Sequence, residues 1–270
     1  MARHLALIAA GTLLVGGPLL AAEPVVNPLA DSATWEDMRY DIVGDTEIQN
    51  GIAVLELDAP ARAHDAATVP IVLRQIDEAA AVTKATVVVD ENPAPVAAVF
   101  DFSPAMGPID FELRVRVDQY SNVRVLTESD NGLSMSGRFV KASGGCSAPA
   151  SRDPEMALAN LGQMKLRMFG DEPLMSIPRR EAQIMIRHPN YSGLQRDQVT
   201  HLFIPAHFID HMEVWQGDDL LFTMDGGISV SENPVFRFSY DDNGAPDLLV
   251  KATDTEGNVF ENRLSKSMGS

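Results

Sequence analysis

The chain contains a single cysteine among its 270 residues, which excludes an internal disulfide. Basic side chains are also scarce, because 21 lysines and arginines stand against 38 acidic residues and leave a formal net charge of −17. Such an acidic chain is poorly suited to bind nucleic acid or an anionic membrane surface. The acidity suits an exported protein that must stay soluble, and it is compatible with docking onto a basic protein.

Motifs that carry enzyme chemistry are missing as well. The sequence has no G-x-S-x-G elbow, no P-loop, no G-x-G-x-x-G fingerprint and no C-x-x-C pair. A single thiol without an adjacent base or cofactor motif indicates a protein on which chemistry is performed, not a catalyst. We therefore predict no catalytic residue, no cofactor and no enzyme activity.

Three histidines, His201, His207 and His211, lie close together in the sequence. An H-x-x-x-H pair binds zinc when it lies on a helix, but this stretch has the pattern of a strand. On a strand, residues four apart are separated by about 13 Å, which is too far for one tetrahedral ion. No glutamate follows His207 to act as a base, so we predict no metal site.

Residues 1–22 have the pattern of a secretory signal. A positive start at Arg3 precedes an apolar run that glycines and Pro18 interrupt, and small residues at positions 21 and 22 offer a cleavage site. The run is short for a membrane span, and no later stretch is apolar enough to cross a bilayer. We expect cleavage after Ala22 and a mature protein outside the cytoplasm, without a membrane partner.

The rest of the chain predicts an all-β fold. Residues 34–42 place Trp35, Met38 and Ile42 on one face of a short N-terminal helix, with Asp31 or Ser32 as its cap. After that helix, apolar residues alternate with polar ones and turn residues recur every eight to twelve positions. The predicted strands are 52–57, 69–75, 83–89, 96–102, 111–117, 123–128, 133–141, 164–169, 182–186, 200–204, 207–215, 220–224, 228–230, 235–240, 248–253 and 259–264. This pattern favours two immunoglobulin-like antiparallel β-sandwich domains joined by a linker, and it leaves their relative packing open.

The strand at residues 111–117 has the clearest alternation. One face is apolar, while Glu112, Arg114, Arg116 and Asp118 make the other face fully charged. The two arginines could form an anion site, but a solvated sheet face is the simpler interpretation. We therefore predict that both arginines are exposed.

The lone cysteine lies in a segment of small residues, 142–149, which we call the cysteine segment. Gly144 and Gly145 precede Cys146, and Pro149 follows three residues later. A lone cysteine is often a small buried residue, but this segment offers no Val, Ile, Leu or Phe with which to pack. We predict that Cys146 is exposed and functional and that the two glycines allow it to be presented flexibly. A sulfur enclosed in an apolar interior would contradict a carrier role.

Several motifs in order resemble those of a known pair of proteins. The motifs in the first half are Trp35, residues 59–71, residues 89–95 and Gly144-Gly145-Cys146, and those in the second half are residues 186–189, 204–209 and 229–234. The first set resembles SoxY, a subunit of the periplasmic sulfur-oxidation carrier, and the second set resembles its partner SoxZ. The chain is most similar to fused SoxYZ-like carriers associated with quinoprotein (PQQ-dependent alcohol) dehydrogenases.

The resemblance implies domain bounds and a role. Together with the signal pattern at the N-terminus and a lapse of the alternation between residues 151 and 163, it gives a signal peptide at 1–22, a SoxY-like domain at 31–149 that ends in the GGC segment, a linker at 150–163 and a SoxZ-like domain at 164–266. It also implies that Cys146 is a carrier thiol in the periplasm, to which partner redox enzymes attach small sulfur-containing groups. Those partners would be sulfur-oxidation enzymes or a PQQ-dependent dehydrogenase.

One departure from the pattern and one alternative stay open. In SoxY the cysteine lies at a free C-terminal end, whereas here a whole domain follows it, so two chain segments must enter any partner. Cys146 lies five residues beyond Lys141, which allows a reach of about 17 Å. The alternative function is a non-catalytic docking module for a periplasmic quinoprotein dehydrogenase, with an incidental cysteine.

Overall fold

The computed structural model describes residues 27–50, 54–149, 158–170 and 179–267. Within these residues the chain is mostly β, with two facing sheets of nine and six strands and one short N-terminal α-helix. The predicted all-β fold class is therefore confirmed. The predicted signal peptide and residues 150–157 of the predicted linker lie outside the described residues. Among the described residues, no helix is both long enough and apolar enough to span a bilayer.

The elements follow the predicted strands closely, often to within two residues. The first half contains α1 (Ala33–Val43), β1 (Gln49–Asn50), β2 (Leu55–Asp58), β3 (Val69–Gln75), β4 (Val82–Val89), β5 (Val96–Phe102), the 3₁₀ turn η2 (Pro104–Met106), β6 (Asp110–Val115), β7 (Ser121–Ser129) and β8 (Gly132–Val140). The second half contains β9 (Met164–Phe169), β10 (Arg179–Ile186), β11 (Ile209–Gln216), β12 (Asp219–Gly226), β13 (Val235–Asp241), β14 (Asp247–Asp254) and β15 (Val259–Ser265).

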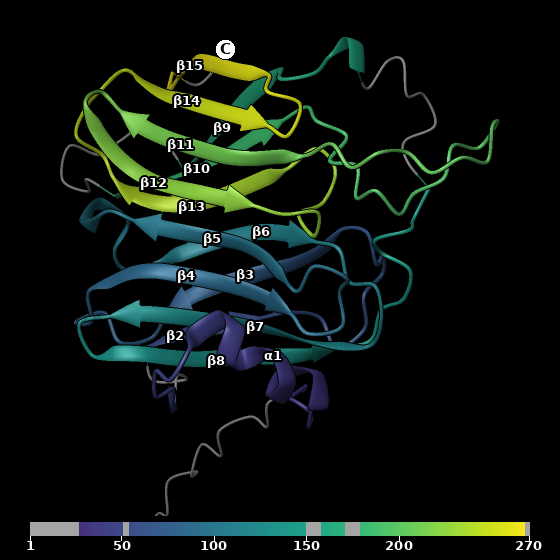
Figure 1. Ribbon diagram of the computed structural model, residues 1–270. Helices are drawn as coiled ribbons and strands as arrows, with labels where there is room; N and C mark the ends of the chain where they lie inside the picture. The colour runs from purple at the N-terminus through teal and green to yellow at the C-terminus, as the bar shows by residue number, and fades with distance from the viewer. Residues whose placement is uncertain (1–26, 51–53, 150–157, 171–178, 268–270) are drawn as a thin grey trace, which may run out of the picture.

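The two halves lie edge to edge, and both sheets run through them (Figure 1). The nine-stranded sheet has the order β1-β8-β7-β4-β5-β12-β11-β14-β15, and the six-stranded sheet has the order β2-β3-β6-β13-β10-β9. Antiparallel β5–β12 and β6–β13 pairs therefore join the halves, in addition to the linker. One pair, between the two-residue β1 and β8, is parallel.

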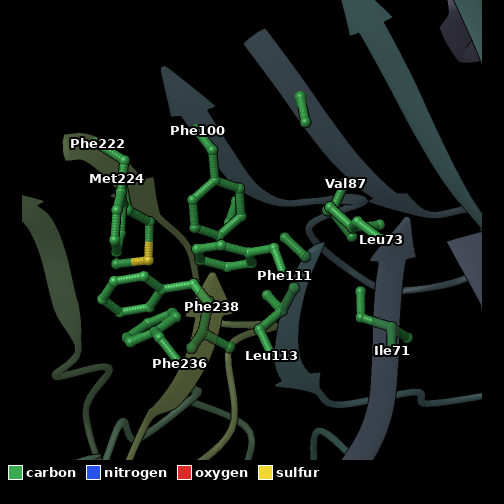
Figure 2. Packing of buried hydrophobic residues seen from close by; sticks show 14 of the residues in the cluster. Ile71, Leu73, Val87, Phe100, Phe111, Leu113, Phe222, Met224, Phe236 and Phe238 are labelled. Carbon is green, nitrogen blue, oxygen red and sulfur yellow. The ribbon is translucent and has the colours of Figure 1, made fainter. Parts of the chain in front are cut away.

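A continuous apolar core fills the space between the sheets. It arises from period-two alternation, as in β6, where Phe111, Leu113 and Val115 are buried and Arg114 is exposed. At the junction the rings of both halves meet (Figure 2). The centroid of the Phe111 ring lies 4.9 Å from the ring centroid of Phe100 and 5.2 Å from that of Phe222. The two halves thus share one hydrophobic core.

Helix α1 covers part of the outer face of the nine-stranded sheet. Its cap is Ser32, whose hydroxyl accepts a hydrogen bond from the Trp35 amide at 3.0 Å. Trp35 is buried against Val88 of β4 and Leu126 of β7, and Met38 and Ile42 pack beside it. The predicted helical face is confirmed.

Two predicted strands, 200–204 and 228–230, are absent. Phe203 and Val230 each form only an isolated bridge, with Arg196 and Val115 respectively. His201 has a left-handed φ of 59°, and Asp197 accepts hydrogen bonds from the amides of Val199 and Thr200, so the first stretch follows a turn. Short apolar runs of this kind do not distinguish strands from structured loops.

Candidate functional site

The cysteine segment leaves the end of β8 and turns back toward the second half. Lys141 still pairs with the first half through a bridge to Arg62, and residues 145–147 then form a turn. The Gly144 amide donates to the Asp118 carbonyl at 2.7 Å, and the Gly145 amide donates to the Val117 carbonyl at 3.1 Å. Backbone hydrogen bonds therefore fix the segment on the first half, just before the cysteine.

The two glycines serve different purposes. Gly144 has a left-handed φ of 77°, which glycine adopts without strain. Gly145 allows a close backbone approach, because a Cβ there would lie 2.2 Å from the carbonyl oxygen of Ala66 and 2.6 Å from that of Val117. In this structure the glycines therefore hold the segment in place. These contacts do not allow the flexible presentation of Cys146 that was predicted for Gly144 and Gly145.

A loop of the second half, residues 188–195, covers the segment, and we call it the covering loop. The Ser192 hydroxyl donates to the Cys146 carbonyl, and the Gln195 side-chain amide donates to the Ala148 carbonyl at 3.0 Å. Arg116 donates through Nη1 to the Gly145 carbonyl at 3.2 Å and through Nη2 to the Asn190 carbonyl at 3.1 Å. We call this contact between the cysteine segment and the covering loop the seam.

Cys146 is fully buried in the seam, with 0% of its surface exposed. The predicted exposed thiol is wrong for this structure. The prediction rested on the local sequence, and the residues that cover the thiol come from the other half of the chain. The sulfur nevertheless belongs to neither cluster of packed apolar side chains. The groups that hold its turn are polar, and they bind the backbone amide and carbonyl of Cys146. The burial of the sulfur itself counts against a carrier role unless the segment can leave this site.

The environment of the thiol disfavours its ionised form. Burial and, to a smaller extent, the charge of Asp118 raise the pKa of Cys146 to about 12, against the opposing effect of Arg116. The Asp118 carboxylate lies close because it accepts a hydrogen bond from the Cys146 amide at 3.1 Å. In the closed seam the cysteine is therefore a neutral thiol at physiological pH, and nucleophilic chemistry requires the segment to leave the seam.

Arg116 differs from its prediction as well. Arg114 is exposed as predicted, but Arg116 is 1% exposed and lies just beyond the end of β6. Its amide donates to the Ser229 carbonyl of the second half at 2.7 Å, which brings the side chain under the covering loop. Burial lowers the pKa of Arg116, against the opposing influence of Glu232, Cys146 and Asp65. The predicted solvated face is therefore correct for Arg114 and wrong for Arg116.

A hollow of about 330 Å³ adjoins the seam on its solvent side. Its lining comes from both sides of the seam and consists of Ser147, Pro149, Leu194, Arg196, Asp197, Gln198 and His201. Two larger hollows, of about 560 and 680 Å³, lie beside α1 and have no residue of the cysteine segment in their lining. Cys146 itself lines none of the three, and the hollow beside Ser147 and Pro149 is the one that borders its segment.

The structure separates the two histidines of the H-x-x-x-H pair. His211 pairs with Asp225 at 2.7 Å on the surface, whereas His207 lies inside with His188 and Asp254. Both buried histidines direct Nε2 at the same carboxylate oxygen of Asp254, from 2.7 Å for His207 and 3.3 Å for His188. The three ligand atoms lie within 4.8 Å of one another, close enough to suggest a metal site.

The hydrogen bonds of this cluster favour a structural role over metal binding. The Asn190 amide donates to Nδ1 of His188 at 3.0 Å, so in the neutral imidazole Nε2 carries the proton and faces Asp254. Coordination through Nε2 would require that proton to move to a nitrogen already occupied by an N–H donor. Burial lowers the pKa of His188, which keeps the ring neutral. The sequence pattern does not reveal this cluster, because His188 and Asp254 lie 66 residues apart.

The Asp254 carboxylate is held ionised. Burial works to raise its pKa, but hydrogen bonds from Asn258, His207 and His188 outweigh burial and lower the pKa of Asp254 to about 2. The cluster also supports the covering loop, because His188 binds the Asn190 amide while the backbones of Tyr191 and His207 pair at 2.7 and 3.0 Å. It therefore positions the loop that covers Cys146.

Comparison with known proteins gives two family matches. The model described as "Sulfur oxidation protein SoxY" matches residues 39–146 and therefore runs to the cysteine itself. The model described as "Sulphur oxidation protein SoxZ" matches residues 178–265. A search of curated proteins finds no match. Among solved structures, the sulfur carrier protein SoxY from Chlorobium limicola f thiosulfatophilum is 27% identical over 40% of this chain and 96% of its own, with a TM-score of 0.34.

The class of protein that the fold and the two matches indicate is an all-β protein of sulfur oxidation. More particularly, a SoxY domain and a SoxZ domain in one polypeptide support a fused SoxYZ carrier.

Proposed function

We propose that this chain is a periplasmic covalent carrier that holds a small sulfur-containing group on Cys146 while partner redox enzymes act on it. The observation that carries the proposal is the SoxY match, which ends at Cys146. The SoxZ match in the same chain supports it. The periplasmic location rests on the signal-like sequence of residues 1–22.

The chemistry on the cysteine is the formation and cleavage of a sulfur–sulfur bond. Joining a thiolate compound R–S⁻ to the Cys146 thiol forms R–S–S–Cys and releases one proton and two electrons. A partner redox enzyme accepts the two electrons. The carrier contributes a thiol that the partner activates, and catalysis belongs to the partner.

Carrier function requires the seam to open. The covering side chains bind the cysteine segment through the carbonyls of Gly145, Cys146 and Ala148. Water can replace each of these hydrogen bonds, so breaking one costs only about 1 kcal/mol net. If the backbone bonds of Gly144 and Gly145 to the first half are released as well, Cys146 can move about 17 Å from Lys141, which is sufficient for a shallow active-site mouth.

A second candidate function is a docking module for a periplasmic quinoprotein (PQQ-dependent) dehydrogenase, with an incidental cysteine. The complete burial of Cys146 and the raised pKa of its thiol favour this candidate. The quinoprotein association rests on the sequence resemblance alone. In this reading the thiol never leaves the seam.

Intact-mass measurement on protein taken from its native compartment separates the two functions. A carrier shows added mass that reductant removes and that is absent from the Cys146→Ser variant. Unmodified protein under sulfur-oxidising conditions, together with full activity of the partner enzymes with Cys146→Ser, would establish the docking module instead. A Ser147→Cys variant that also carries Cys146→Ser tests whether a thiol at the neighbouring exposed position can replace it.

A further inference from the structure

Among the described residues of the first half, three arginines are buried, and one of them lacks an acidic hydrogen-bond partner. Arg124 binds the Asp90 carboxylate, with Nε at 2.8 Å from one oxygen, and Arg138 contacts Glu56. Within the described ranges, Arg116 forms no ion pair with any carboxylate, although it is the most deeply buried of the three at 1% exposed. Its position therefore needs a separate explanation.

The hydrogen bonds of Arg116 do not neutralise its charge. Nη1 and Nη2 donate to the neutral carbonyls of Gly145 and Asn190. Nε has no hydrogen-bond partner among the described residues, and its N–H is buried. A buried cation without a counter-charge is costly, and folded proteins normally pair it. The guanidinium thus retains both charge and donor capacity next to the cysteine segment.

The nearby acidic groups are engaged elsewhere or act at longer range. Asp118 accepts a hydrogen bond from the Cys146 amide at its Oδ1 atom, at 3.1 Å. Glu232 and Asp65 influence Arg116 through space without forming a hydrogen bond to it among the described contacts. An anion attached to the sulfur of Cys146 is therefore the group that could pair directly with Arg116.

We propose that the Arg116 guanidinium is the counter-charge that retains an anionic sulfur group, such as a sulfonate-terminated disulfide, on Cys146 when the seam is closed. This inference rests on the proposed carrier function. A guanidinium suits the role because its planar N–H groups match the oxygens of an oxyanion, with charge-assisted hydrogen bonds. A hollow of about 330 Å³ borders the cysteine segment at Ser147, the residue after Cys146, so open space lies next to the turn that carries the thiol.

Two probes test the inference on the full chain, one that leaves an anionic adduct on Cys146 and one that leaves a neutral adduct. Tetrathionate converts the thiol to an anionic adduct: Cys–SH + ⁻O₃S–S–S–SO₃⁻ gives Cys–S–S–SO₃⁻ + ²⁻S–SO₃ + H⁺. Methyl methanethiosulfonate gives a neutral adduct: Cys–SH + CH₃–S–SO₂–CH₃ gives Cys–S–S–CH₃ + CH₃SO₂H. Intact mass confirms complete loading. Uncharged dithiothreitol then releases each group by reducing the S–S bond, regenerating the Cys146 thiol, with thiosulfate or methanethiol as the leaving product.

The measured quantity is the ratio of the release rates of the anionic and neutral adducts. Arg116→Met loosens the seam for both adducts, but it removes the charge that only the anionic one uses. We expect the ratio to rise about 10-fold in Arg116→Met relative to wild type, and to stay within about threefold in Arg116→Lys, which keeps the charge. Arg114→Met is the matched control, because it removes the same charge from an exposed position two residues away.

The possible failures are distinguishable. If neither probe loads Cys146 in the native protein, the carrier function is wrong and this inference falls with it. If both probes load but the ratio is the same in wild type, Arg116→Met and Arg114→Met, the carrier function stands and Arg116 has only a structural role. If Arg116→Met does not fold, the melting temperatures of the two wild-type adducts give the test. A higher melting temperature for the anionic adduct than for the neutral adduct supports the pairing with Arg116, and an equal or lower melting temperature overturns it.

Discussion

Where β6 meets β13, rings from both halves pack around Phe111, which lies within 6.2 Å of five other phenylalanine rings. Where the cysteine segment meets the covering loop, the halves instead join through hydrogen bonds from side chains such as Ser192 and Gln195 to backbone carbonyls. Both contacts are buried, and both unite the SoxY and SoxZ domains. They differ in whether water can replace the interactions that hold them together. Water can replace the hydrogen bonds of the seam, but it cannot replace the packing of the rings.

This difference assigns separate roles to the two junctions. Apolar surface gains nothing from water, so the aromatic junction resists separation in proportion to the area that it buries. Hydrogen bonds in the seam exchange for bonds to water at small net cost. The seam can therefore open while the shared core stays closed. The aromatic junction fixes the two halves as one body, and the seam controls access to the thiol.

The largest expected effect comes from breaking the aromatic junction. Phe111→Ala removes a fully buried ring and should lower the free energy of unfolding by about 3–5 kcal/mol. Urea unfolding measures the change. Phe203→Ala is the control, because Phe203 is 58% exposed and should change stability by less than about 1 kcal/mol. Equal losses in the two variants would contradict a core shared between the halves.

The next effect concerns the cluster that supports the covering loop. Asp254→Asn removes the carboxylate that accepts hydrogen bonds from His188 and His207, and it should cost about 2–4 kcal/mol at pH 7. Because folding lowers the pKa of Asp254 from 3.8 to about 2, its contribution is complete above pH 4 and is lost as the pH falls towards 2. The stability gap between wild type and Asp254→Asn should therefore narrow in acid. Urea unfolding across this pH range checks it.

The surface pair of His211 and Asp225 provides the matched control. It has the same residue types at 2.7 Å, but its side chains are 41% and 66% exposed. Asp225→Asn should change stability by less than about 1 kcal/mol. A loss as large as that of Asp254→Asn would mean that burial of the Asp254 cluster is not what makes it stabilising.

The third effect tests the close approach of Gly145. Gly145→Ala places a Cβ against the carbonyls of Ala66 and Val117, which should cost the closed seam about 1–3 kcal/mol and speed the labelling of Cys146 about 10- to 100-fold. Gly144→Asn is the control, because asparagine tolerates a left-handed φ and nothing lies within 3.8 Å of its Cβ position. Faster labelling in Gly144→Asn than in Gly145→Ala would refute the close-approach argument.

Local periodicity was sufficient to predict most strands. In β6 the alternation of Phe111, Leu113 and Val115 predicted both the strand and its buried face, because sheet geometry is a local property of the backbone. The same alternation failed at Arg116, where β6 has ended and a loop of the second half covers the side chain. Alternation describes the faces of a strand and gives no information about what covers its end.

The candidate site shows the same limit. The small residues around Cys146 correctly indicated that the segment has no apolar core of its own, since the sulfur lies outside both apolar clusters. Its burial depends on Ser192, which lies 46 residues away in sequence, and on how the two halves pack. The pairing of His188 with Asp254 likewise spans 66 residues. Contacts of this range depend on topology, which a single sequence does not specify.

The smallest expected effect measures one hydrogen bond of the seam. Ser192→Ala removes the hydroxyl that donates to the Cys146 carbonyl, and should weaken the closed seam by about 1 kcal/mol, which speeds thiol labelling about fivefold.

Because the pKa of the closed thiol is about 12, labelling proceeds through the open form. In wild type and variant alike, its rate should therefore rise with pH up to about 8.5, the ordinary pKa of a free thiol. Ser147→Ala is the control, because its exposed hydroxyl donates to the Gly144 carbonyl of the same segment at 3.5 Å and not to the covering loop. If both serine variants label at the wild-type rate, the bond from Ser192 does not limit opening, and the bonds from Gln195 and Arg116 would have to account for the protection of the thiol.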